Sequence, residues 1–271
     1  MSEYNDTLLE FGDLIREKTF NPFEGPLKVG VDLGTANIVV AVVDSEGKPV
    51  AGATYPSTVV KDGIVVDFIG ASKAVREMKA ELESMLGVEL RTAATAVPPG
   101  IMDGNVKIIS NVVEASNFEV STVIDEPTAA ATVLGVTDGA VVDVGGGTTG
   151  ISILKDGKVV FVADEPTGGT HMSLVLAGYY GTTFEEAEKI KKDKEREFEV
   201  FPIVKPVVQK MASIVKRFIQ GYDVDTIYVV GGACSFSQFT SVFEKEIGIR
   251  TIKPAEPLLV TPLGIAMNST L

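Results

Sequence analysis

The most informative stretch of this 271-residue chain is Val141-Val142-Asp143-Val144-Gly145-Gly146-Gly147-Thr148-Thr149. An apolar strand ends near an acidic residue, three glycines form the turn, and hydroxyl residues begin the next strand. Three consecutive glycines cost conformational entropy that an ordinary hairpin would not need, so they indicate backbone that turns sharply or approaches a ligand closely. Because backbone N–H groups in such a turn can bind phosphate oxygens without a basic side chain, the stretch predicts a phosphate site.

A shorter version of this turn occurs earlier in the chain, at Val31-Asp32-Leu33-Gly34-Thr35, and an apolar strand follows it again. Each copy then reaches a second turn, which is Asp44-Ser45-Glu46-Gly47-Lys48 in the first and Lys155-Asp156-Gly157-Lys158 in the second. A strand and turn pattern that occurs twice predicts an α/β protein built from two halves of one plan.

The first 26 residues have a different character. Tyr4, Leu8, Phe11 and Ile15 recur at helical spacing on a polar segment, and the sequence NPFEGP at 21–26 interrupts the chain before the first strand. We therefore expect an amphipathic N-terminal arm and linker at 1–26, a first half at 27–138 and a second half at 139–271. The arm is either a targeting tail or a helix folded onto the body.

Helical patterns are expected elsewhere along the chain. The charged run FEEAEKIKKDKEREF at 184–198 predicts one helix, and Pro202 is expected to begin another, because proline is favoured in the first helical turn. Further helices are predicted over 71–86, 105–116, 128–134 and 172–180.

Composition excludes several classes of protein. Lys and Arg number 24 against 37 Asp and Glu, so the net charge of −13 argues against a nucleic-acid partner. One cysteine and one histidine exclude disulfide scaffolds and zinc clusters and favour a reducing, cytoplasmic setting. No apolar run approaches the roughly 20 residues that span a bilayer, and no signal peptide is recognisable, so we expect no membrane partner.

The chemistry of the turns predicts a metal as well as a phosphate. Asp32 and Asp143 would repel phosphate directly, and they fit the site only if a hard cation such as Mg²⁺ lies between, usually through water. The chain has neither a G-x-x-x-x-G-K-[ST] motif nor a G-x-G-x-x-G between strand and helix, which excludes the P-loop and Rossmann sites.

These motifs resemble the actin-like ATPase superfamily, which includes actin, MreB, FtsA, DnaK-type chaperones and sugar kinases. The resemblance runs from about Lys28 to the C-terminus and implies a duplicated ribonuclease H-like fold that binds ATP or ADP with Mg²⁺. The matching segments are 32–35 and 143–149 for the phosphates, 95–98 and 262–266 for the two connections between halves, and 228–235 for the adenosine.

The resemblance also implies roles for single residues. Glu126 would lie near the metal and the attacking water, whereas Glu188 and Lys191 would reach the ribose. From the residues alone, Glu126 could instead cap a helix and the other two could be a solvated charged face. The implied catalytic residues are Glu126 and Asp143, the water-mediated metal ligands are Asp32 and Asp143, and the nucleotide contacts are Gly34, Thr35, Asn37, Gly145, Gly146, Gly147, Thr148, Glu188, Lys191, Gly231, Gly232 and Ser235.

A narrower resemblance covers nearly the whole chain. GVDLGTANIVVAVVD, DEPTAAA, VVDVGGGTTGISILKDGKV and ADEPTGGTHMSL are similar to the EutJ family, which belongs to ethanolamine utilisation and is encoded with bacterial microcompartment components. This implies an ATP- and Mg²⁺-binding chaperone or assembly factor for a microcompartment enzyme or shell protein, with weak ATPase activity. The alternatives are a self-assembling, homo-oligomeric scaffold of the MreB or FtsA type and a nucleotide-binding pseudo-ATPase.

The chain also departs from its larger relatives. The intervals between Asp32 and Thr95 and between Lys191 and Val229 leave little room for the outer subdomains of DnaK-type proteins, so we expect reduced outer subdomains and a shallow cleft. Lys73 is the candidate for their γ-phosphate lysine. Of the remaining residues, His171 either approaches the phosphates or is structural, and Cys234 is expected to be a packing residue.

Overall fold

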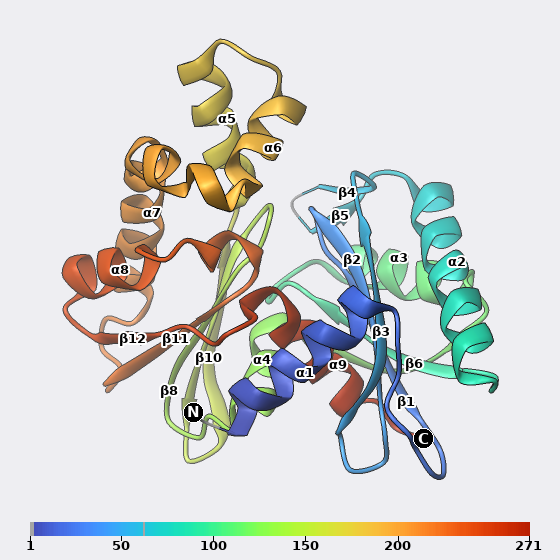
Figure 1. The fold of residues 1–271 in the computed structure, drawn as a ribbon. Helices are drawn as coiled ribbons and strands as arrows, with labels where there is room; N and C mark the ends of the chain where they lie inside the picture. Colours follow the sequence, from blue (N-terminus) through green and yellow to red (C-terminus); the bar gives the residue numbers. More distant parts are fainter. Residues whose placement is uncertain (1–2, 62) are drawn as a thin grey trace.

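The computed structural model describes residues 3–61 and 63–271 and consists of two α/β halves that repeat one topology (Figure 1). The five-stranded sheets have the orders β3-β2-β1-β6-β7 and β10-β9-β8-β11-β12. In each sheet the first three strands form an antiparallel meander and the last two add in parallel, so the predicted duplicated α/β fold is confirmed. The strands are β1 (Lys28–Leu33), β2 (Asn37–Val43), β3 (Pro49–Pro56), β6 (Thr92–Val97), β7 (Glu119–Asp125), β8 (Gly139–Val144), β9 (Thr149–Lys155), β10 (Lys158–Glu165), β11 (Thr226–Val230) and β12 (Arg250–Ile252).

Each half has its own apolar core between the sheet and its outer helices. In the first half the sheet packs on α2 (Phe68–Leu86) and α3 (Asp103–Glu114), and in the second half on α5 (Gly169–Tyr180), α7 (Glu197–Phe218) and α8 (Phe239–Ile247). A third cluster of buried side chains joins the halves through α4 (Glu126–Leu134) and α9 (Val260–Met267). The fold therefore places two helices between the sheets, where they can connect the halves.

Helices α4 and α9 cross with their backbones in contact. A Cβ atom at Gly264 would clash with the carbonyl oxygen of Ala129 in α4, and one at Gly30 in β1 would clash with the backbone of Ala266. Glycine is required at both positions because no side-chain atom fits. The N-terminal ends of both helices, at Glu126 and Thr261, consequently reach the same cavity.

The N-terminal arm is a helix, α1 (Glu3–Glu17), that packs on the body beside β3 (Figure 1). Leu8 and Phe11 are fully buried in the cluster that joins the halves. Its polar side chains also hold the loop before α9, since Asn5 accepts from the Ala255 N–H at 2.8 Å and Arg16 pairs with Glu256 at 2.7 Å. Of the two alternatives for this segment, the structure shows a helix folded onto the body.

The outer parts of both halves are small. A two-stranded hairpin, β4 (Val60–Lys61) with β5 (Ile64–Val65), stands above the first sheet, and α5 with α6 (Phe184–Lys192) stands above the second (Figure 1). Within the described ranges, no helix has both the length and the apolar composition that crossing a bilayer requires.

The prediction that Pro202 begins a helix was wrong. The helix predicted over the charged run ends at Lys192. Asp193 then has an extended backbone, and its side chain accepts from the Glu195 N–H at the start of a short 3-10 turn, η1 (Lys194–Arg196). Helix α7 then starts at Glu197 and contains both Pro202 and Pro206. Proline inside a helix removes a backbone hydrogen bond, but α7 buries a long apolar face that offsets this loss.

The crossing of α4 and α9 generates a stability prediction. Gly264→Ala should lower the free energy of unfolding by about 2 kcal/mol or more, because its methyl group forces the helices apart. Gly178→Ala is the matched control, since that helical glycine has open space around its Cβ position, and alanine should stabilise α5 by up to about 1 kcal/mol. Chemical denaturation measures both, and equal stability of the Gly264 variant and the unmodified protein would contradict the packing argument.

Candidate functional site

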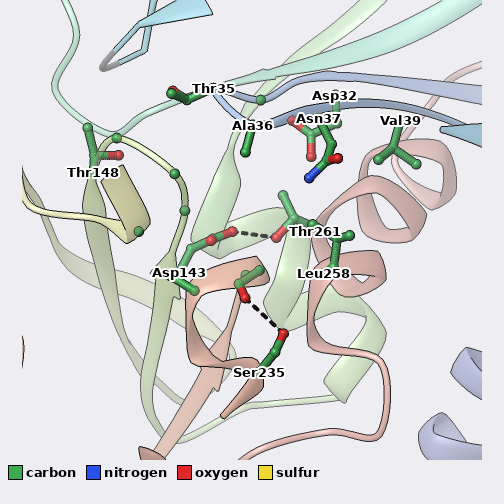
Figure 2. A pocket seen from close by; sticks show the side chains of 18 of the residues that line it. Asp32, Thr35, Ala36, Asn37, Val39, Asp143, Thr148, Ser235, Leu258 and Thr261 are labelled. Atoms are coloured by element: carbon green, nitrogen blue, oxygen red, sulfur yellow. Dashed lines mark hydrogen bonds between the residues drawn. The ribbon is translucent and has the colours of Figure 1, made fainter. Parts of the chain in front are cut away.

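A cavity of about 400 Å³ opens between the two halves, a volume typical of sites that bind small molecules (Figure 2). Both glycine turns lie on its wall, together with the start of α4, helix α6 and the turn after β11. The residues implied as catalytic, nucleotide-binding or metal-holding all line this one cavity, namely Asp32, Gly34, Thr35, Asn37, Glu126, Asp143, Gly145, Gly146, Gly147, Thr148, Glu188, Lys191, Gly231, Gly232 and Ser235.

The triple-glycine turn is fixed by the N-terminus of α5. The N–H groups of Gly169 and Thr170 donate to the carbonyl oxygens of Gly145 and Gly146, at 2.9 and 2.7 Å. These bonds occupy the acceptors of the turn, whereas the N–H groups of Gly146 and Gly147 have no acceptor among the described residues. Unpaired N–H donors at the wall of a cavity suit an anion such as phosphate.

Three carboxyl groups face this end of the cavity. Burial, and the nearby charge of Asp143, raise the pKa of Asp32 to about 7, and burial raises the pKa of Asp143 to about 6. Burial and the charges of Asp143 and Asp32 also raise the pKa of Glu126 well above its usual range. The cluster is therefore electrostatically unfavourable without a cation.

A hard cation fits this donor set, since Mg²⁺ prefers carboxylate oxygens and retains several waters. No three acidic, histidine or cysteine side chains in the described part of the chain are close enough to hold a metal directly. Asp164, which the sequence analysis did not select, adds a fourth carboxyl near Glu126 and Asp143. One of its oxygens is buried and has no hydrogen-bond partner among the described residues. Burial raises the pKa of Asp164 to about 6. A cation held through water would satisfy these oxygens.

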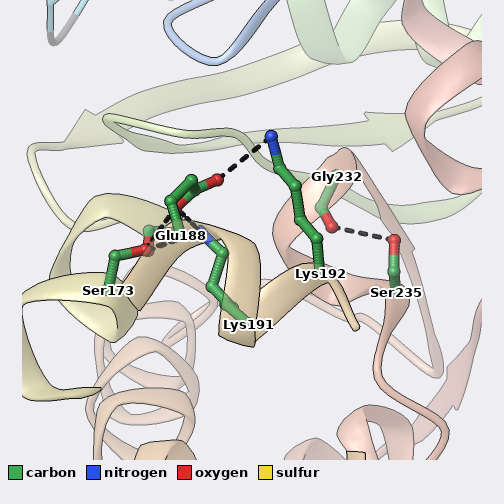
Figure 3. A network of polar contacts seen from close by, with 7 residues as sticks. Ser173, Glu188, Lys191, Lys192, Gly232 and Ser235 are labelled. Carbon is green, nitrogen blue, oxygen red and sulfur yellow. Dashed lines mark hydrogen bonds and ion pairs between the residues drawn. The ribbon is translucent and has the colours of Figure 1, made fainter. Parts of the chain in front are cut away.

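Helix α6 lines another part of the cavity wall and carries a network of partly buried polar groups (Figure 3). The ammonium of Lys191 donates to Gly169 O at 3.0 Å, Ser173 Oγ at 2.9 Å and Glu188 Oε2 at 2.6 Å. Ser173 also donates to Glu188. An ammonium has three protons, so Lys191 is saturated by protein acceptors. These side chains are not the solvated face that helical spacing alone would suggest.

The charges of this network shift two pKa values. Burial opposes ionisation of Glu188, but the ammonium of Lys191 outweighs it and lowers the pKa of that carboxyl. Burial also lowers the pKa of Lys191. Lys192 pairs with the other Glu188 oxygen at 3.3 Å, remains about half exposed and lines the cavity, as does Lys194. Lys192 and Lys194 are thus the cations available to a ligand here, and the sequence analysis did not select them.

The turn after β11 forms the third wall. Gly231 adopts a left-handed backbone with φ of 89°, and a Cβ there would overlap Asp143 and the Val144 carbonyl. The turn continues as η2 (Gly232–Ser235), in which Ser235 donates to Gly232 O at 2.8 Å. Phe236 and Leu258 give this wall apolar surface of the kind a flat base could contact.

The positions of several side chains decide between alternatives that the sequence left open, and one side chain lies away from its predicted place. Lys73 lies on the exposed surface of α2 near Glu77 and does not line the cavity, so it was wrong as a candidate for a phosphate lysine. His171 accepts from the Gly168 N–H at 3.4 Å and belongs to the start of α5, which is a structural role. Asp125, not Glu126, caps α4. Cys234 is buried in the second core, as expected of a packing residue.

The two halves and the cavity between them have the fold of actin-like proteins. Residues 105–260 match the family described as type IV pilus assembly protein PilM. MreB5 of Spiroplasma citri bound to AMPPNP shares the fold, with a TM-score of 0.72, 16% identity and coverage of 89% of this chain and 95% of the other.

Other relatives are much more similar. The ethanolamine utilization protein EutJ of Escherichia coli K12 is 46% identical over 90% of this chain and 87% of its own length. The crystal structure of EutJ from Carboxydothermus hydrogenoformans has a TM-score of 0.93 and 52% identity, with 98% of both chains covered. The chain belongs to the EutJ family of ethanolamine utilization proteins and, through residues 105–260, to the broader PilM family.

The raised carboxyl pKa values generate a prediction about pH. A carboxyl whose folded pKa is raised stabilises the protein at low pH, and this contribution is lost as the pH rises through the folded pKa. The free energy of unfolding of the ligand-free protein should therefore decrease from about pH 4, the ordinary pKa of an aspartate, to about pH 7, the folded pKa of Asp32.

Asp32→Asn tests the source of this dependence. The variant should be more stable than the unmodified protein at pH 8, and its stability should depend less on pH, because one buried charge is removed. Chemical denaturation at pH 5 and at pH 8 measures this. If the change in unfolding free energy between these pH values were the same in the variant and the unmodified protein, Asp32 would not be the source of the dependence.

Proposed function

We propose that this protein binds ATP or ADP with Mg²⁺ in the cavity between its halves and uses the nucleotide to control a protein partner. The observation that carries the proposal is the convergence of both glycine turns and the buried carboxyl groups on one cavity. A ligand that contacts both halves favours one angle between them, which is how a bound nucleotide can select a conformation. The shared fold of MreB5 structures bound to AMPPNP and to ADP supports this choice of ligand.

The proposed roles follow from position. The free N–H groups of Gly146 and Gly147 would hold phosphate oxygens, and Asp32 and Asp143 would hold the water ligands of the metal. Glu126, at the start of α4, would orient a water molecule toward the terminal phosphate. At the other end Glu188 would face the ribose and Gly231, Gly232 and Ser235 the adenosine. Mg²⁺ would supply neutralisation of phosphate charge.

We further propose that hydrolysis is slow. Among the described residues, the cavity has no lysine or arginine from the first half, and its cations, Lys191, Lys192 and Lys194, all come from the ribose end. The charge that develops on a terminal phosphate would then be neutralised by the metal and backbone dipoles alone. This arrangement favours a protein that holds its nucleotide for long periods, or a pseudo-ATPase.

The partner is proposed from family membership. Relatives at 46% identity are ethanolamine utilization proteins, and we infer that this chain assists a microcompartment enzyme or shell protein of that system. It would act in the cytoplasm or at the microcompartment. A self-assembling scaffold, and so a homo-oligomer, is the competing proposal.

Calorimetry with saturating Mg²⁺-ATP tests the nucleotide proposal. Asp143→Ala should weaken binding at least tenfold, because a metal-holding carboxylate is lost, whereas Glu126→Gln should bind ATP within about threefold of the unmodified protein. Turnover of the Glu126→Gln variant should fall by about a hundredfold if Glu126 orients the attacking water. Exposed Asp225→Ala is the control. Absence of binding to the unmodified protein would end the proposal.

Affinity capture from cells that produce the microcompartment tests the partner proposal. A microcompartment enzyme or shell protein should be retained in an ATP-dependent manner by the unmodified protein and lost with Asp143→Ala. Light scattering provides the second measurement. A rise with ATP and protein concentration, without a retained partner, would favour the self-assembling scaffold.

A further inference from the structure

Thr261, which the sequence analysis did not select, makes a buried polar contact with Asp143 between α9 and the second sheet. It is the second residue of α9 and only 3% exposed, and its hydroxyl donates to Asp143 Oδ2 at 2.5 Å (Figure 2). Asp143 belongs to β8 of the second half, whereas α9 packs against β1 and β2 of the first half. The bond therefore joins a side chain of the acidic cluster to the helix that connects the halves.

The position of the Thr261 hydroxyl is closely determined. Helix α9 has backbone contact with α4 at Gly264 and with β1 at Gly30, so it cannot shift without disturbing both elements. The preceding segment is held too, because the Gly231 N–H donates to Pro257 O at 2.8 Å. A β-branched threonine in a helix also has few χ1 rotamers. The donor is consequently fixed relative to the first half.

Asp143 has little else to orient it. Within residues 3–61 and 63–271, the Thr261 hydroxyl is the one side-chain donor that bonds its carboxylate. The carboxylate is buried beside Gly231, and no lysine or arginine in the described part of the chain pairs with it. A hydrogen bond to an ionised group is strong and directional, so this bond restricts the orientation of the carboxylate.

We propose that Thr261 is a positioning residue that aims the Asp143 carboxylate at the water-held cation and ties the metal part of the site to α9. This inference rests on the proposed function. Thr261 itself does not touch the metal. Because its helix packs on the first half and Asp143 lies in the second, the carboxylate is correctly oriented only when the two halves are in the arrangement seen here.

The test compares nucleotide binding with and without Mg²⁺ by calorimetry. Thr261→Val keeps the shape and removes the hydroxyl, and it should reduce the gain in ATP affinity that Mg²⁺ provides by about tenfold. Affinity measured in a chelator should change less than twofold, and Thr261→Ser should restore the Mg²⁺ gain to within about threefold. Thr251→Val, also buried but in β12, is the matched control.

Two results would overturn the inference. An unchanged Mg²⁺ gain in Thr261→Val would show that the hydroxyl does not orient Asp143. An equal loss of affinity with and without Mg²⁺ would show that Thr261 only supports the fold.

Hydrogen exchange of the ligand-free protein separates this inference from the proposed function. Thr261→Val and Asp143→Ala should each speed exchange of residues 260–267 by about tenfold, and the double variant should add nothing further, since both remove the same bond. Independent, additive effects would refute the link to α9. If the unmodified protein bound no nucleotide, the proposed function would fail, and the exchange data would still decide whether Asp143 and α9 are joined.

Discussion

The rest of the structure depends on the backbone contact of α9 with α4 and β1. Glycine at positions 264 and 30 lets these elements approach until no side-chain atom fits between them. Two consequences follow from that closeness. The N-terminal ends of α4 and α9 are brought to the floor of the cavity, where they present Glu126 and Thr261. The two sheets are also joined through a dense apolar layer that includes α1, so a change at the floor of the cavity is felt by both halves.

The acidic floor of the cavity works against the stability of the ligand-free protein. Asp32, Glu126 and Asp143 are gathered where burial disfavours their charge, and the charge of Asp143 further raises the pKa values of Asp32 and Glu126. Proteins retain such arrangements at functional sites, because a strongly bound cation reverses the sign of the interaction. The apolar cores stabilise the fold enough to offset the unfavourable burial of these carboxyl groups. In the proposed function the same repulsion makes the site dependent on its metal.

The two ends of the cavity are built by different means. At the phosphate end the ligand would meet backbone N–H groups and carboxylates, whereas at the ribose end it would meet charged side chains of α6. Lys191 connects the two ends, because it bonds Gly169, whose own N–H donates to Gly145 of the glycine turn. Helix α6 is thereby held in fixed relation to the phosphate turn even though the outer subdomains are small. The absence of first-half cations from the described cavity wall is the physical basis for proposing slow hydrolysis.

Local patterns in the sequence predicted the duplicated fold and the two glycine turns of the cavity wall, since glycine turns and strand patterns are properties of short segments. The other predicted wall residues came from the resemblance to known families, and Lys192, Lys194 and Thr261 were missed. The sequence could not show where α6 ends, because capping by Asp193 and burial along α7 override the local preference of Pro202. It also could not separate the neighbours Lys191 and Lys192, which both line the cavity. The ammonium of Lys191 is saturated by protein acceptors, whereas Lys192 is about half exposed. Contacts such as Thr261 with Asp143 join residues far apart in the chain, and only the packing of α9 between the halves brings them within hydrogen-bonding distance.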